Sequence, residues 1–220
     1  MDKLISHDEA LDKIRDGATL MFGGFMGNGS PHMFIDGLVE RGVKDLFVIC
    51  TDTGWETYGI GKLVVNKQIR KLMASHIGLN KETGRQMTAG EMEVELVPQG
   101  TLAEKIRCGG YGLGGVLTRT GLGTLVEEGK EKIEVEGVTY LLETAVRADV
   151  AILGAHTADT AGNLVYKGST RNFNLLMASA ADTTIAEAQE IVEVGGIDPD
   201  AVHTPGVFVQ YIVRGGALNG

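Results

Sequence analysis

Short apolar runs alternate with helix-like segments along most of this chain, and this alternation limits the possible folds more than any other feature. The first run, ATLMFGG at residues 18–24, is bounded by glycine and too short for a helix, so it predicts a buried strand. Strand-like runs recur at residues 45–51, 68–76 and 93–98, before a helical TLAEKIR at 101–107. This order favours an α/β fold with an open, mostly parallel sheet and flanking helices.

Two capping patterns predict where the first helices begin. Ser6 and Glu9 have the spacing of a capping box, and the apolar positions after them predict a short helix that stops near residue 16. Ser30 and Pro31 predict the N-cap and the first residue of a second helix, which runs to about residue 41.

The second half of the chain predicts a small antiparallel insertion and then more strands. Residues 131–143 alternate in polarity on both sides of Glu136 and Gly137, which is a hairpin signal. Apolar runs at 149–155, 183–188 and 206–213 predict further strands. No repeat or low-complexity linker divides the sequence, so we expect residues 1–220 to form a single domain.

Charge and hydropathy exclude several classes of protein. The formal net charge is −9, which disfavours nucleic acid as a partner because phosphate contacts need a basic surface. No apolar stretch is long enough to cross a bilayer, which argues against a membrane partner. The N-terminal sequence also lacks the continuous apolar core of a secretion signal, and we therefore expect a cytoplasmic protein.

The cysteines and histidines do not form a recognisable site. Cys50 and Cys108 are the only cysteines, and their separation argues against a disulfide framework and against structural zinc. The five histidines show no metal-ligand spacing and no pairing with a nucleophile, so structural or surface roles are expected. We expect no metal.

A glycine-rich loop, MFGGFMGNGSP at residues 21–31, joins the first predicted strand to the second predicted helix. Glycine supplies 32 of the 220 residues, and three of them fall within residues 23–27. A strand, a glycine loop and a helix start can hold anionic or carbonyl oxygen on backbone N–H groups. The alternative is a tight strand-to-helix turn with no ligand. The phosphate-binding Walker pattern is absent, and the spacing does not fit the dinucleotide fingerprint.

The residues around this loop resemble a known signature. Asp16-Gly17, two free positions, an apolar triplet, Gly23-Gly24-Phe25, three free positions, Gly29, one free position and Pro31 match the α-subunit signature of the family I coenzyme A transferases. Segments 75–115, 118–130 and 147–156 also resemble α subunits of acetate or acetoacetate CoA-transferases. The resemblance extends from about residue 5 to about residue 213.

The resemblance implies an enzyme that is completed by a second chain. Family I enzymes move CoA between carboxylates through a glutamate, which in heteromeric members belongs to the β subunit and lies within Glu-x-Gly-x-x-Gly. Four Glu-x-Gly triplets occur in this chain, and none is completed by the last glycine: they begin at Glu40, Glu82, Glu127 and Glu193. We therefore expect no catalytic residue here, a β-subunit partner in an α2β2 assembly, acyl-CoA and short-chain carboxylates as substrates, and no permanently bound cofactor.

The same resemblance assigns candidate site residues. It implies a CoA-contacting or acyl-pocket role for the loop residues Gly24, Phe25, Met26, Gly27, Asn28, Gly29 and Ser30. Gln99 resembles a glutamine that reaches the substrate carboxylate, and the alternative for it is a purely structural loop residue. Asp52 and Thr53 follow a predicted strand at the sheet edge where ligands bind, but residues 51–54 fit an Asx-type turn equally well.

A second glycine-rich run, CGGYGLGG at residues 108–115, predicts a flexible or tightly turned loop near a partner subunit rather than a nucleotide site.

Two other functional classes compete with the transferase interpretation. One is a phosphosugar-binding module of related α/β architecture. The other is a non-catalytic scaffold subunit, in which the glycine loop is only a turn.

Overall fold

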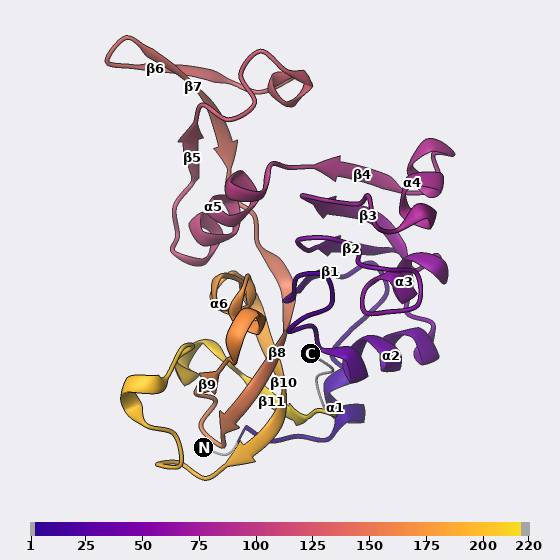
Figure 1. Ribbon diagram of the computed structural model, residues 1–220, viewed down its shortest axis with the longest axis vertical. Coiled ribbons are helices and arrows are strands. Elements are labelled where there is room, and N and C mark those ends of the chain that lie inside the picture. Colours follow the sequence, from indigo (N-terminus) through magenta and orange to yellow (C-terminus); the bar gives the residue numbers. More distant parts are fainter. Residues whose placement is uncertain (1–2, 217–220) are drawn as a thin grey trace.

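The computed structural model describes residues 3–216, and its largest feature is a twisted sheet of eight strands (Figure 1). The strands of this sheet are β1 (Thr19–Phe22), β2 (Leu46–Ile49), β3 (Ile69–Ala74), β4 (Glu93–Leu96), β8 (Ala148–Asp159), β9 (Leu164–Val165), β10 (Ala181–Val192) and β11 (Tyr211–Arg214). Seven of them follow the order β11-β10-β8-β1-β2-β3-β4, with every neighbouring pair parallel. Only β9 pairs antiparallel, with β8. The expected open, mostly parallel α/β sheet is confirmed.

Helices lie on both faces of the sheet because its strands send alternate side chains into two hydrophobic clusters. In β1, Leu20 and Phe22 point into one cluster and Met21 into the other. The first cluster includes residues of α1 (His7–Leu11), α2 (His32–Arg41) and α3 (Gly61–Val65), and α4 (Lys81–Thr88) packs beside α3. The second includes residues of α5 (Gln99–Gly110) and α6 (Asn174–Met177). Four 3-10 turns complete the described elements: Leu125–Glu127, Gly168–Arg171, Pro199–Ala201 and Gly206–Phe208.

A second, antiparallel sheet projects away from the main sheet (Figure 1). It consists of β5 (Gly115–Thr118), β6 (Lys132–Val135) and β7 (Val138–Thr144) in the order β5-β7-β6, and we call residues 115–144 the arm. The predicted hairpin is confirmed at Glu136 and Gly137, whose φ values of 51° and 76° suit the tight turn between β6 and β7. Our loop prediction for residues 108–115 was wrong at both ends, because Cys108–Gly110 finish α5 and Gly115 begins β5.

The first helix is shorter than the sequence predicts. The capping box is present, with the N–H of Glu9 donating to Ser6 Oγ at 3.2 Å and the N–H of Ser6 donating to the Glu9 carboxylate at 2.9 Å. The helix nevertheless ends at Leu11, and Ile14 is buried in the turns that follow it. The apolar periodicity predicted correctly that Ala10, Leu11 and Ile14 are buried, but it predicted too late an end for the helix.

The second helix begins one residue later than predicted, and its cap comes from another part of the chain. Pro31 is the N-cap, and Ser30 makes no capping hydrogen bond. The N–H groups of Met33 and Phe34 donate instead to the two carboxylate oxygens of Glu187, at 3.2 and 2.7 Å. A side chain of β10 therefore satisfies the helix end that Ser30 was predicted to cap.

Candidate functional site

The glycine loop lies where β1 ends, and side chains from the segment around α6 hold it in place. The N–H of Gly24 donates to Asn172 Oδ1 at 3.1 Å, and Asn174 Nδ2 donates to the carbonyl of Gly29 at 3.0 Å. Gly29 has a φ of 75°, and a Cβ there would lie 2.5 Å from the carbonyl oxygen of Thr170. Close packing therefore requires glycine at this position. No sequence signal pointed to Asn172 or Asn174, because they lie about 145 residues from the loop.

An aromatic pair holds the middle of the loop from the other side. The ring of His32 packs on Tyr58 with centroids 4.3 Å apart, and His32 Nε2 lies 2.9 Å from the carbonyl oxygen of Gly27. Burial lowers the pKa of His32, so a neutral imidazole donates this hydrogen bond. A Cβ on Gly27 would lie 2.1 Å from the Tyr58 ring. His32 thus has the structural role expected for the histidines.

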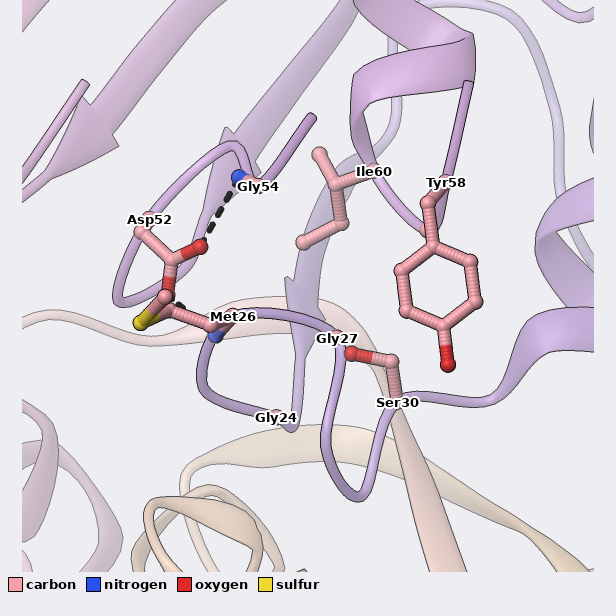
Figure 2. Close-up of a pocket in the computed structure, with 9 residues that line it drawn as sticks. Gly24, Met26, Gly27, Ser30, Asp52, Gly54, Tyr58 and Ile60 are labelled. Atoms are coloured by element: carbon pink, nitrogen blue, oxygen red, sulfur yellow. Dashed lines mark hydrogen bonds between the residues drawn. The ribbon is translucent and has the colours of Figure 1, made fainter. Parts of the chain in front are cut away.

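Asp52 connects the glycine loop to the end of β2 (Figure 2). Its carboxylate accepts the N–H of Met26 at 2.9 Å, the N–H of Gly54 at 2.8 Å and the hydroxyl of Thr51 at 2.7 Å. The bond to Gly54 is the Asx-type turn that the sequence allowed at residues 51–54. The buried Asp52 side chain therefore fixes the shape of the loop through groups of its own chain.

Most backbone N–H groups of the loop are also used internally. Five residues donate theirs to acceptors within the chain: Gly24, Phe25, Met26, Asn28 and Ser30. Within residues 3–216, the N–H groups of Gly27 and Gly29 have no hydrogen-bond partner. Gly27 lines a cavity of about 10 Å³ between the loop and residues 52–60, which is about the size needed for one water molecule. The cavity suits a single oxygen atom and is too small for an acyl chain.

The outer surface of the loop is formed by the side chains of Phe25, Met26 and Asn28. Phe25 is 45% exposed, and Met26 and Asn28 are half-buried. The three glycines from Gly24 to Gly29 and Ser30 are buried beneath them. The loop thus presents the apolar ring of Phe25 at its surface.

The remaining candidates lie on the same edge but differ in exposure. Gln99 is exposed at the first position of α5, not in a loop, and its Oε1 contacts the hydroxyl of Ser75 at the end of β3. Thr53 is buried, and its Oγ1 accepts from the Thr83 hydroxyl at 3.0 Å. The carboxyl ends of β1 to β4 therefore bring together the loop, Asp52 and Gln99, while the Thr53 hydroxyl is engaged inside the chain.

One buried carboxylate near the site was not predicted. Glu187 is 2% exposed, and it caps α2, the helix that follows the glycine loop. Burial raises its pKa to about 7, although the hydrogen bonds from Phe34 and Met33 act in the opposite direction. The position of this glutamate in an apolar strand, TTIAEA, was the available signal.

The described residues contain no recognisable metal centre. No three His, Cys, Asp or Glu side chains among residues 3–216 are grouped so that they could hold a metal ion. Both cysteines are free and buried, and burial raises the pKa of the Cys50 thiol well above its usual value. Over the same residues, no helix has the length and apolar character needed to cross a membrane.

Comparison with known proteins identifies the fold and the family. Residues 4–215 match the family model for coenzyme A transferases. The chain belongs to the coenzyme A transferase family. The resemblance in the glycine loop is thereby confirmed, and this chain is a transferase subunit of that family.

Two coenzyme A transferase relatives match almost from end to end. The acetate CoA-transferase subunit alpha of Escherichia coli K12 is 54% identical over 211 residues, which cover 96% of each chain. The acetoacetyl-CoA:acetate/butyrate CoA transferase alpha subunit of Clostridium acetobutylicum is 50% identical over 212 residues, which cover 96% of this chain and 97% of that one.

A solved coenzyme A transferase has the same fold. The structure of an acyl-CoA transferase from E. coli O157:H7 in a thioester complex with CoA superposes with a TM-score of 0.87 at 21% identity. The match covers 97% of this chain and 47% of that chain. The present chain therefore corresponds to about half of that longer protein.

Proposed function

We propose that this coenzyme A transferase chain is the α subunit of a heteromeric short-chain acyl-CoA:carboxylate CoA-transferase of the acetate, acetoacetate and butyrate class. The main support for this proposal is the similarity to two α subunits whose names state those substrates. They are 54% and 50% identical to this chain over nearly its whole length. Its partner is a β subunit, in an α2β2 assembly. CoA and acyl-CoA act as substrates, with no permanently bound cofactor, and the chain works as a single domain in the cytoplasm.

The reaction proposed for the complete enzyme is a ping-pong exchange. A glutamate carboxylate on the partner subunit attacks the acyl-CoA carbonyl, forming a mixed anhydride and releasing CoA as thiolate. The thiolate attacks the glutamyl carbonyl of the anhydride, which releases the first acid and leaves a glutamyl-CoA thioester. The acceptor acid then reverses both steps. Covalent catalysis divides one difficult exchange into easier steps.

This chain supplies one wall of the shared site. Phe25, Met26 and Asn28 face the acyl-CoA from the outer surface of the glycine loop. The unpaired N–H of Gly27 is placed to stabilise a developing oxyanion, since the adjoining cavity accepts one oxygen atom. Asp52 keeps the loop in shape, and Gln99 offers its amide to a substrate carboxylate from the neighbouring strand end.

The test is acyl exchange between acetate and acetoacetyl-CoA by the chain produced with and without its β subunit. We expect turnover only from the complex. Phe25→Ala in the complex is expected to lower kcat/KM about tenfold, because an exposed ring is lost without disturbing the loop. Met87→Ala is the matched control, since Met87 on α4 is 43% exposed and lies outside the proposed site.

Three outcomes would contradict the proposal. Full activity of the isolated chain would mean that the nucleophile is not on a partner. Unchanged turnover of the Phe25→Ala complex would assign the loop to a scaffold role, the alternative that its many internal hydrogen bonds favour. Binding of a phosphosugar without binding of CoA would favour the phosphosugar-binding module.

A further inference from the structure

Asn172 connects the glycine loop to the segment before α6 through every hydrogen-bonding group of its side-chain amide. Its Oδ1 accepts the N–H of Gly24 at 3.1 Å and the N–H of Phe173 at 2.7 Å. Its Nδ2 donates to the carbonyl of Asn28 at 3.0 Å and to the carbonyl of Ser169 at 3.1 Å. These four partners fix the orientation of the amide, because the N–H groups need an oxygen acceptor and the carbonyls need a donor.

The two loop contacts of this amide lie on either side of residues 25–27. Gly24 precedes this stretch and Asn28 follows it. The stretch contains the exposed ring of Phe25 and the N–H of Gly27, which is unpaired within residues 3–216. Two backbone hydrogen bonds between Phe25 and Asn28, at 3.0 and 2.9 Å, close the stretch into a turn. One side chain therefore fixes both ends of the part of the loop that we assign to the substrate.

The chain on both sides of Asn172 is anchored to the core and to the main sheet. Phe173, the next residue, is 8% exposed and packs in the second hydrophobic cluster. Asn174 Nδ2 donates to the carbonyl of Thr170 at 2.8 Å, and its Oδ1 accepts the N–H of Gly154 in β8 at 3.1 Å. The Asn172 amide thus acts on the loop from a rigid base, as precise positioning requires.

The backbone of Asn172 has a conformation that few side chains tolerate. Its φ is 20° and its ψ is −125°. The four other non-glycine residues with positive φ in the described part of the chain have φ values of 50–58°, which suit the left-handed helical region. Residues held in rare conformations cost free energy and are found mainly at functional sites. Asparagine and aspartate adopt such conformations most readily among residues with a Cβ, and of these two only the asparagine side chain can donate to Asn28 at neutral pH.

We propose that Asn172 is a positioning residue for CoA transfer, which holds residues 25–27 in the shape that places the Gly27 N–H and the Phe25 ring against the acyl-CoA. The inference rests on the proposed function, because it assigns the geometry of that reaction to one side chain. Fixed donors stabilise developing charge without reorganising during the reaction. A displacement of about 1 Å can lower a rate about a hundredfold. The unusual backbone at residue 172 brings the amide within reach of both ends of the stretch.

Asn172→Asp in the complex with the β subunit separates the two loop contacts. The carboxylate has nearly the same size and still accepts the Gly24 N–H, but it cannot donate to the Asn28 carbonyl. In exchange between acetate and acetoacetyl-CoA, kcat and kcat/KM are expected to fall together by about tenfold to a hundredfold, with KM within about twofold. Asn66→Asp is the matched control, because Asn66 Nδ2 also donates to a backbone carbonyl, that of Lys62 at 2.8 Å, at the exposed end of α3. It is expected to keep the kcat of the unchanged complex.

A second pair of variants separates rate from stability. Asn172→Gly and Asn172→Ala both remove the whole amide, but only alanine keeps a Cβ on the unusual backbone. Asn172→Gly is therefore expected to have a higher Tm than Asn172→Ala. Both are expected to lower kcat by the same factor, about tenfold to a hundredfold. If Asn172 had only a structural role, both variants would keep the unchanged kcat at temperatures where they are folded.

Hydrogen exchange of the complex reports on the loop without turnover. The backbone amides of residues 24–30 are expected to exchange at least about threefold faster in the three Asn172 variants, because the loop opens more often when a hydrogen bond that holds it is lost. Asn66→Asp is expected to keep the exchange rate of the unchanged complex.

The outcomes separate this inference from the proposed function. An unchanged complex that exchanges no CoA overturns the proposed function, and this inference with it. An active complex whose Asn172→Asp and Asn172→Gly variants keep kcat overturns the inference alone, whatever the loop amides do. Variants with a lower kcat whose loop amides exchange at the unchanged rate also overturn it, because the loss of rate then has another cause. A lower kcat with faster loop exchange and an unchanged KM supports it.

Discussion

Glu187 shows how one buried side chain links the stability of the fold to pH. Its folded pKa of about 7 lies above the ordinary glutamate value of 4.5. The folded state therefore binds a proton more tightly than the unfolded state does between these two values. The stabilisation from this carboxyl group is complete below about pH 4.5 and is lost as the pH rises through about 7.

We therefore expect Glu187→Gln to flatten the pH dependence of stability. The unchanged chain should lose up to about 3 kcal/mol of unfolding free energy between about pH 4.5 and pH 8 from this group, whereas the variant should lack that loss. Urea unfolding at several pH values measures the difference. Glu190→Gln, an exposed position on the same strand, is the control and should retain the slope. Equal slopes for both variants would contradict the assignment.

At the level of single residues, sequence reasoning located site residues that are close to the glycine loop in the chain. It missed the residues that contact the loop or the following helix from distant parts of the sequence. Asp52 was found because polar residues after a parallel strand lie at the ligand-binding edge. Its hydrogen bond from the N–H of Met26, however, follows only from the tertiary structure. Asn172 and Glu187 were not found, because each acts on a backbone segment more than 140 residues away.

Among the elements, the arm depends on an unusual buried ion pair. Lys105 of α5 lies 3.1 Å from the carboxylate of Glu143 on β7, and Lys130 lies 2.5 Å from its other oxygen. The side chains of Lys105 and Glu143 are 6% and 2% exposed. Desolvation makes such a pair a weak net stabiliser, but removing one partner leaves a buried charge.

Glu143→Ala is expected to destabilise the protein by about 3–5 kcal/mol, because the Lys105 ammonium loses its partner. Denaturant unfolding gives the free energy, and limited proteolysis reports whether the arm loosens first. The double variant Lys105→Met/Glu143→Leu serves as the control and should recover most of the stability, since no buried charge remains unpaired and the Lys130 side chain, 23% exposed, reaches solvent. A single variant as stable as the unchanged chain would contradict the role of the pair.

Prediction of helices and strands succeeded in the apolar runs themselves and failed at the residues where the elements begin and end. The parallel strands and the β6-β7 hairpin were found from their patterns. The strand predicted at residues 206–213 was wrong in its first half, where Gly206–Phe208 form a 3-10 turn before β11. The strand β5 was missed because its pairing with β7 is a tertiary contact and its first residue is the last of a glycine-rich run. The start of α2 was misplaced because a carboxylate from β10 replaced the local cap.

For the whole molecule, the α/β class followed from the order of strands and helices, but strand order in space did not. The chain leaves the main sheet after β4, builds the arm, and returns to place β8 beside β1. Neither pattern nor propensity encodes that return, since it depends on which edges remain free once the first half has folded.

The expectation of a single domain leads to a prediction of cooperative unfolding. Leu20 in the main sheet and Leu141 in the arm are both fully buried. Leu20→Ala and Leu141→Ala should each cost about 2–5 kcal/mol and shift the same transition. Trp55 fluorescence and circular dichroism should report coincident curves for every variant. A Leu141→Ala variant that leaves the Trp55 transition unmoved would show that the arm unfolds separately.

The hydrogen bonds that hold the glycine loop also determine when the loop can form during translation. During synthesis from the N-terminus, a ribosome-bound fragment that ends in the arm already contains every residue of the loop. It lacks β8, which pairs with β1, and both Asn172 and Asn174, which hold Gly24 and Gly29. The loop therefore reaches its final shape only after translation has passed the segment around α6, so a truncated nascent chain carries the motif without its geometry.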